Sequence, residues 1–142
     1  KSRKTYEYRI LNARFRNPTR RLDTYFYHYP LDTEKMSEAA KYLIGEHDFA
    51  SFCGNPKMKK STVREIYSID ISLKGSYLNM TFHGSGFLQY MVRILSGTLL
   101  EVGFGKREAD SMQELLEAKN RSLAGATAPA KGLSLLKVHY AN

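Results

Sequence analysis

Residues 84–103 read GSGFLQYMVRILSGTLLEVG, and this stretch carries most of the information about the fold. From about Gly86 onward its apolar side chains recur at helical spacing, which predicts a helix with one face packed on a core. A second stripe of this helix, at i, i+4, i+7 and i+11, carries Gly86, Tyr90, Arg93 and Gly97. The stretch therefore predicts a mainly apolar helix with an arginine between two glycines on one side.

Arg93 is the candidate functional residue of this helix. Glycine costs roughly 1 kcal/mol in a helix interior relative to alanine, so the two glycines indicate that another group approaches closely. An arginine with open space around it suits a carboxylate or a phosphate in a fork geometry. A partly buried arginine tied to a structural acid fits the same pattern. Spacing alone leaves both interpretations open.

The composition is typical of one globular domain without a membrane segment. At 142 residues, 42% of them hydrophobic, the chain can bury about two thirds of its unfolded surface. Its apolar runs are far shorter than the roughly 20 residues that span a bilayer. The single cysteine, Cys53, leaves no intrachain disulfide and fits a reducing cytoplasm, and the four histidines are scattered. We therefore expect a cytoplasmic protein without a metal site.

The charge pattern favours a polyanionic partner. The net charge is +8, which favours nucleic-acid binding through phosphate neutralisation, although a basic surface that only aids solubility is the alternative. The loop that contains Lys57, Lys59 and Lys60 offers candidate contacts to an RNA backbone, and a solvated loop is the competing explanation. The basic residues gather in three clusters: Lys1, Arg3 and Lys4; Arg14, Arg16, Arg20 and Arg21; Lys57, Lys59, Lys60 and Arg64.

Periodicity along the chain predicts an α+β fold. The expected strands cover residues 5–12, 22–29, 63–73, 133–140 and the residues that follow a turn at 74–76. The expected helices run from an N-cap at Asp32 to about Gly45, from about Gly86 to Gly103, and from about Glu108 to Ala118. Strands outnumber the connections that could be parallel crossovers. We therefore predict a mixed, mainly antiparallel sheet with about three helices packed on one face.

Four segments, taken together, resemble the TruA family of tRNA pseudouridine synthases. Residues 84–103 are similar to its G-x-G-F-L-x-x-M-V-R helix, and residues 4–10 (KTYEYRI) resemble its Y-x-Y strand. Residues 43–52 (LIGEHDFASF) resemble its L-x-G-x-H-D-F-x-x-F segment. Residues 124–135 (AGATAPAKGLSL) resemble its A-G-x-T-A-P-A-x-G-L-x-L run. The segments occur in the family's order and span nearly the whole chain.

The resemblance assigns roles to three residues. Tyr6 matches the tyrosine that stacks on the target uracil and is proposed to act as a base late in the reaction. Arg93 matches the arginine that pairs with the catalytic aspartate and helps to displace the target base. Leu133 matches an apolar residue that lines the uracil pocket. An ordinary strand tyrosine and a plain core leucine are the alternatives for Tyr6 and Leu133.

The family's nucleophilic aspartate has no counterpart in this chain. The family carries it in an R-T-D-x-G-V type motif upstream of the Y-x-Y strand, and no such motif occurs here. We therefore expect residues 1–142 to be the C-terminal domain of a longer isomerase, inactive alone, in which Arg93 lacks its partner. The resemblance implies conversion of uridine to pseudouridine in the tRNA anticodon stem-loop by a homodimer, without a metal or organic cofactor. A non-catalytic RNA-binding module and a dimerisation domain are the alternatives.

Overall fold

The computed structural model describes residues 2–13 and 23–140, so Lys1 and the basic cluster at Arg14, Arg16, Arg20 and Arg21 lie outside the described residues. The strands are β1 (Ser2–Asn12), β2 (Tyr25–Tyr27), β3 (Gly45–Asp48), β4 (Val63–Lys74), β5 (Tyr77–Gly84) and β6 (Leu133–Tyr140). The α-helices are α1 (Thr33–Leu43), α2 (Met91–Phe104) and α3 (Ser111–Ala118). Short 3-10 helices are η2 (Ala50–Phe52), η3 (Arg121–Leu123) and η4 (Ala130–Gly132).

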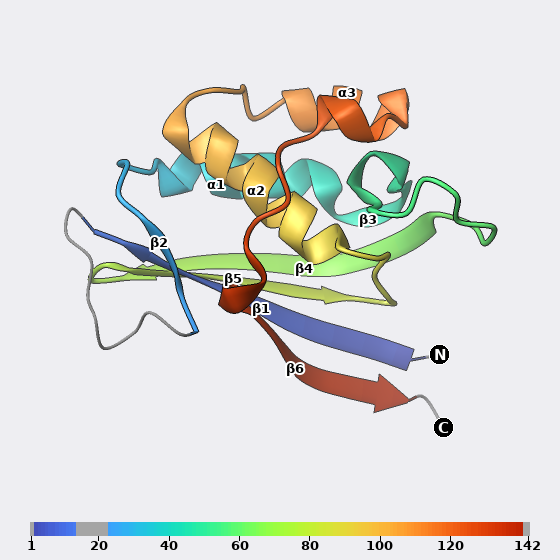
Figure 1. Ribbon diagram of the computed structural model, residues 1–142, viewed down its shortest axis with the longest axis horizontal. Coiled ribbons are helices and arrows are strands. Elements are labelled where there is room, and N and C mark those ends of the chain that lie inside the picture. Colours follow the sequence, from blue (N-terminus) through green and yellow to red (C-terminus); the bar gives the residue numbers. More distant parts are fainter. Residues whose placement is uncertain (1, 14–22, 141–142) are drawn as a thin grey trace.

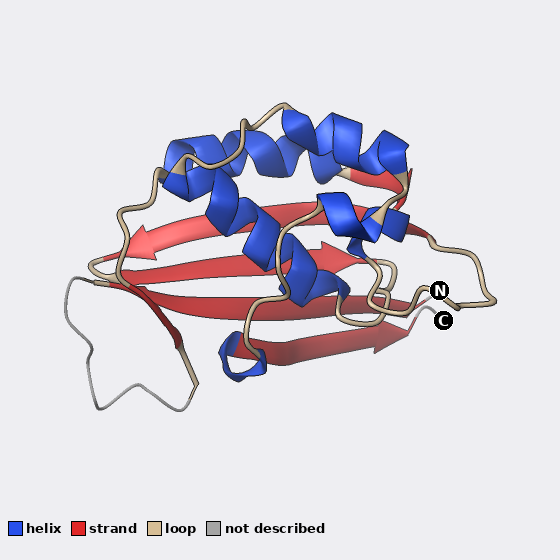
Figure 2. Ribbon diagram, turned by 45° about the horizontal axis from the view of Figure 1, so that its top comes forward, coloured by secondary structure: helices blue, strands red, loops and turns tan. Residues whose placement is uncertain are grey.

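The strands form one sheet in the order β2-β1-β5-β4-β3, and β6 also pairs with β1. β6 runs along the first part of β1, whereas β2 pairs with its last residues. Among the described pairings, β1–β2 is parallel and the others are antiparallel. The helices lie together on one face of the sheet (Figure 1, Figure 2). The predicted α+β class, with a mixed, mainly antiparallel sheet covered on one face, is confirmed.

The core lies between this face of the sheet and the helices. In β5, alternate side chains are buried, as expected for a strand with one face on the core. Helix α1 begins at the predicted N-cap, where the carboxylate of Asp32 accepts a hydrogen bond from the Lys35 backbone N–H at 3.1 Å. Within the described residues, no helix has both the length and the hydropathy that a membrane span requires.

Helix α2 begins later than the sequence predicts. β5 continues to Gly84, which pairs with both neighbouring strands. Tyr90 then adopts a left-handed backbone with a φ of 61°, immediately before the first helical residue, Met91. Gly86 therefore belongs to the connection and not to the helix. Non-helical hydrogen bonds hold this connection: the Ser85 N–H donates to the Glu65 carbonyl at 2.9 Å, and the Gly54 N–H donates to the Gln89 carbonyl at 2.8 Å.

Candidate functional site

Residues 124–129, called the crossing segment below, pass over helix α2 at Gly97. A Cβ atom at Gly97 would overlap the carbonyl oxygen of Ala126, so only glycine admits this approach. Close by, the Gly125 N–H donates to the Thr98 hydroxyl at 2.9 Å. The predicted close approach is thus confirmed at Gly97. At Gly86 it is wrong, because the nearest atom to an added Cβ would be Arg64 Nε at 3.8 Å.

Arg93 is fixed to the crossing segment from both its side chain and its backbone. Its Nε donates to the carbonyl oxygen of Ala128 at 2.7 Å, and the Ala128 N–H donates to the Arg93 carbonyl at 3.0 Å. The guanidinium carbon lies 5.1 Å from the centre of the Tyr90 ring, a cation–π contact. No carboxylate of the described residues forms an ion pair with it. The structural-acid interpretation therefore does not apply within these residues.

The contacts of Arg93 leave its two terminal nitrogens available. The Nε and the ring contact hold the plane of the guanidinium, while neither terminal nitrogen has a hydrogen-bond partner among the described residues. An arginine fork held in this way can accept a carboxylate or phosphate with little further loss of side-chain freedom.

Tyr8 holds the crossing segment from the sheet side. This tyrosine is fully buried in β1, and its hydroxyl donates to the Pro129 carbonyl at 2.6 Å. Burial raises the pKa of the Tyr8 hydroxyl above its ordinary value, Tyr25 raises it further, and Arg93 acts in the opposite direction. Tyr8 is therefore a neutral donor at physiological pH. It belongs to the predicted Y-x-Y strand, but the pattern alone did not distinguish this positioning role from ordinary core packing.

Tyr6 and Leu133 flank Tyr8 on the sheet. Tyr6 lies two residues before Tyr8 on the same face of β1, and its half-buried ring meets Phe87 edge-on with a centroid distance of 5.4 Å. Leu133 pairs with Tyr8 from β6 and is half-buried. Tyr6 pairs with Leu135, a residue that is 52% exposed. The structure thus gathers Leu133 and Arg93 around Tyr8 and the end of the crossing segment, with Tyr6 next along β1.

Tyr6 does not contact Arg93 directly, and the three loop lysines are exposed. Among the described residues, no hydrogen bond or ring contact joins Tyr6 to Arg93. Lys57, Lys59 and Lys60 are exposed on the loop between η2 and β4, and their ammonium groups form no ion pair within the described residues. Their role as RNA-backbone contacts stays a prediction.

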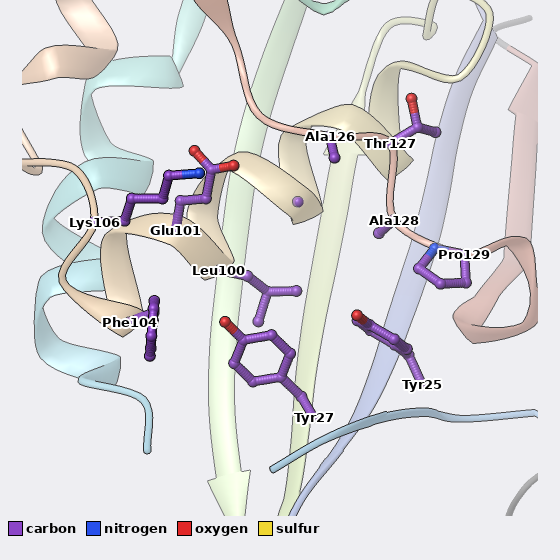
Figure 3. A pocket seen from close by; sticks show the side chains of 11 residues that line it. Tyr25, Tyr27, Leu100, Glu101, Phe104, Lys106, Ala126, Thr127, Ala128 and Pro129 are labelled. Atoms are coloured by element: carbon purple, nitrogen blue, oxygen red, sulfur yellow. The ribbon is translucent and has the colours of Figure 1, made fainter. Parts of the chain in front are cut away.

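A pocket that the sequence did not indicate lies one turn along α2 from Arg93. Its volume is about 270 Å³, and its walls come from β2, the second half of α2 and the crossing segment. In Figure 3, the hydroxyls of Tyr25 and Tyr27 point toward α2 and the crossing segment, and Lys106 and Glu101 lie at the opposite wall. Burial, more than the neighbouring Tyr25, raises the pKa of the Tyr27 hydroxyl.

Glu101, the acidic residue of this pocket, is ion-paired with Arg107. Its Oε1 accepts from Arg107 Nε at 3.0 Å and from Arg107 Nη2 at 2.8 Å. Burial keeps the Tyr27 hydroxyl neutral at physiological pH, and the cavity offers hydroxyl groups and apolar surface. Among the described residues, no group of three or more histidines, cysteines or acidic side chains could hold a metal ion.

Comparisons with known proteins agree on one family. A family profile described as tRNA pseudouridine synthase matches residues 39–141. The chain is 44% identical over 138 residues to tRNA pseudouridine synthase A of Thermoanaerobacter pseudethanolicus, which covers 97% of this chain and 57% of that protein. It is 46% identical over 140 residues to tRNA pseudouridine synthase A of Bacillus licheniformis, covering 99% of this chain and 57% of that protein. The chain thus spans little more than half the length of these relatives, and it belongs to the tRNA pseudouridine synthase family.

Proposed function

We propose that this chain is the C-terminal domain of a tRNA pseudouridine synthase, and that the rest of the protein supplies the nucleophilic aspartate. The relatives extend well beyond the matched region, and the R-T-D-x-G type motif is absent from the present sequence. The observation that carries the proposal is Arg93, whose guanidinium is held at Nε and by Tyr90 while its terminal nitrogens have no partner among the described residues.

The proposed reaction is an isomerisation that loses no atoms overall. A carboxylate attacks C1′ of the target nucleotide as the glycosidic C1′–N1 bond breaks. The uracil then turns, and C5 attacks C1′, which forms the C1′–C5 bond and releases the carboxylate. Removal of the proton from C5 and protonation of N1 complete pseudouridine. The reaction requires no metal or organic cofactor. Arg93 orients the carboxylate through its free fork, so that the reacting groups meet without further reorganisation.

Tyr6 and Leu133 are proposed to receive the flipped uracil. A base that leaves the helical stack needs a flat apolar surface to replace its lost neighbours, which a half-buried tyrosine ring provides. Phe87 supports the Tyr6 ring edge-on, and its placement in the connection before α2 ties the Tyr6 ring to the helix that carries Arg93. The hydroxyl of Tyr6 is then available as the late base.

The proposed partner is tRNA, bound at the anticodon stem-loop by a cytoplasmic homodimer. The net charge of +8 supports a polyanionic partner, with Lys57, Lys59 and Lys60 as exposed backbone contacts. Affinity should therefore fall steeply with salt, as phosphate contacts require. Sedimentation of the full-length protein tests the homodimer, and a monomer at assay concentration would contradict it.

The test of the site is label release from C5 of uridine in an anticodon stem-loop, catalysed by the full-length protein. We expect Arg93→Gln to lower kcat by at least about 100-fold, because the shorter, uncharged amide loses the ionic fork. Lys41→Gln, which removes one exposed charge on α1, is the matched control and should stay within about twofold of wild type. Equal rates for the two variants would contradict the role of Arg93.

A further inference from the structure

A second cavity, of about 490 Å³, lies next to Tyr90. Its walls come from the loop after η2, the residue before α2, and the residues that follow α3. Resting on the proposed function, we infer that this cavity binds the RNA nucleotide adjacent to the target uridine, with the base against Tyr90 and the phosphate at Lys119 and Arg121. The volume is within the range of small-molecule sites and suits one nucleotide.

Tyr90 is held in a conformation that local structure does not require. Its φ of 61° lies in the left-handed region that L residues rarely adopt, and the residue is 48% exposed. Gly54 makes room for the ring, since an added Cβ there would overlap it, and the Gly54 N–H donates to the Gln89 carbonyl at 2.8 Å. Strained residues that the surroundings fix in place are concentrated at ligand sites. Lys119, the other non-glycine residue with positive φ in the described chain, ends α3, where this conformation is common.

Tyr90 also joins this cavity to the proposed catalytic arginine. Its ring lies 5.1 Å from the Arg93 guanidinium carbon, so one aromatic side chain borders both the cavity and Arg93. A nucleotide in the cavity is therefore a neighbour of the uracil that Arg93 helps to displace. An exposed tyrosine face also stacks on any base, which suits a position beside the target.

The charged residues of the cavity are cationic. Arg121 is positioned by its Nη2, which donates to the Thr127 hydroxyl at 3.1 Å within the crossing segment. Lys119 Nζ lies 3.9 Å from a carboxylate oxygen of Asp48, and its side chain is 60% exposed. The other carboxylate oxygen of Asp48 accepts from the Ala50 N–H and the Thr62 hydroxyl, so Asp48 keeps these partners when Lys119 turns toward a phosphate. No acidic side chain is among the residues that line the cavity.

The first test combines Tyr90→Asn with abasic RNA. Asparagine tolerates the left-handed backbone, so the variant removes the ring while preserving the fold. Dissociation constants are measured for the full-length protein and stem-loops with one abasic residue at each position around the target. Wild type should lose about tenfold in affinity at one position adjacent to the target. Tyr90→Asn should lose less than about twofold at that position.

An abasic residue distant from the target should affect both proteins equally, which controls for changes in RNA structure. If no adjacent position weakens wild type, or if Tyr90→Asn shows the same adjacent loss, the inference is overturned. A third outcome also overturns the inference: no abasic position weakens binding, and uridine monophosphate binds wild type and Tyr90→Asn equally well. The cavity would then be a site for a free nucleotide or an anion.

The second test removes the charges. The double variant Lys119→Gln with Arg121→Gln should reduce the slope of log affinity against log salt by about one, as loss of one or two phosphate contacts requires. The matched control is Lys35→Gln with Lys41→Gln, two exposed lysines of α1, which should leave the slope unchanged. An equal slope in the two double variants contradicts the phosphate contact.

Label release by wild type separates this inference from the proposed function. An active wild type with a flat abasic scan rejects this inference alone, whereas an inactive wild type rejects the proposed function.

Discussion

At the residue scale, one phenol and one guanidinium hold the crossing segment in place. The Tyr8 hydroxyl and the Arg93 Nε donate to the adjacent carbonyls of Pro129 and Ala128, one from the sheet and one from the helix. Arg93 is thereby fixed through atoms that are not needed for its proposed partner. Both acceptors are backbone carbonyls, so these hydrogen bonds do not require particular side chains in the crossing segment.

Tyr8→Phe tests this arrangement through alkaline stability. Burial holds the pKa of Tyr8 above the value of about 10 for an unfolded tyrosine, so the folded state retains a proton that the unfolded state loses. The resulting stability is complete below about pH 10 and decreases as pH rises toward the folded pKa. Between about pH 8 and about pH 11, the free energy of unfolding in urea should fall by about 1 kcal/mol more for wild type than for Tyr8→Phe.

At neutral pH the same variant should be about 1 kcal/mol less stable than wild type, because the Pro129 carbonyl loses its donor. Tyr27, whose pKa is also raised, is unchanged in both proteins and so cancels in the comparison. An identical alkaline loss in wild type and Tyr8→Phe would show that Tyr8 does not titrate differently on folding.

At the element scale, the contact of α2 with the crossing segment depends on one glycine. Gly97→Ala places a methyl group against the Ala126 carbonyl, which is backbone and cannot turn aside. We expect a loss of about 1–3 kcal/mol in unfolding free energy, the usual cost of overpacking. Label release by the full-length protein should fall as well, since the displaced segment carries the carbonyl that positions Arg93.

Gly86→Ala is the matched control for Gly97→Ala. The nearest atom to its new methyl group is Arg64 Nε at 3.8 Å, an ordinary van der Waals separation. This variant should change stability by less than about 0.5 kcal/mol. If chemical denaturation showed the same loss of unfolding free energy for both alanine variants, the close contact with Ala126 would not be the reason that position 97 requires glycine.

The sequence predicts these elements well where periodicity and local chemistry agree. Asp32 begins α1 as an N-cap, and the glycine in the stripe of Arg93 admits a close approach at Gly97, as interpreted. The predicted start of α2 is wrong because Ser85 and Gln89 form hydrogen bonds with Glu65 and Gly54, which are distant in the sequence. The left-handed backbone of Tyr90 was likewise not predictable, since tyrosine has no local preference for it.

At the scale of the whole molecule, the sequence predicts the fold class but not the connections that assemble the site. Alternation identified β1 and β6 as strands, yet it could not place them side by side with Leu133 opposite Tyr8. Both small cavities form between elements that are far apart in the chain, and no local pattern reports such proximity. The roles of Tyr6, Arg93 and Leu133 came from a family resemblance, and they remain predictions about a longer protein.

The most direct test of the account compares label release from uridine C5 for this 142-residue chain and for the full-length protein, on the same anticodon stem-loop. The account predicts turnover by the full-length protein and none by the chain alone, because it assigns the nucleophilic aspartate to residues outside these 142. Turnover by the isolated chain would contradict it, since a carboxylate within these residues would then be the nucleophile. An inactive full-length protein would contradict the proposed function itself.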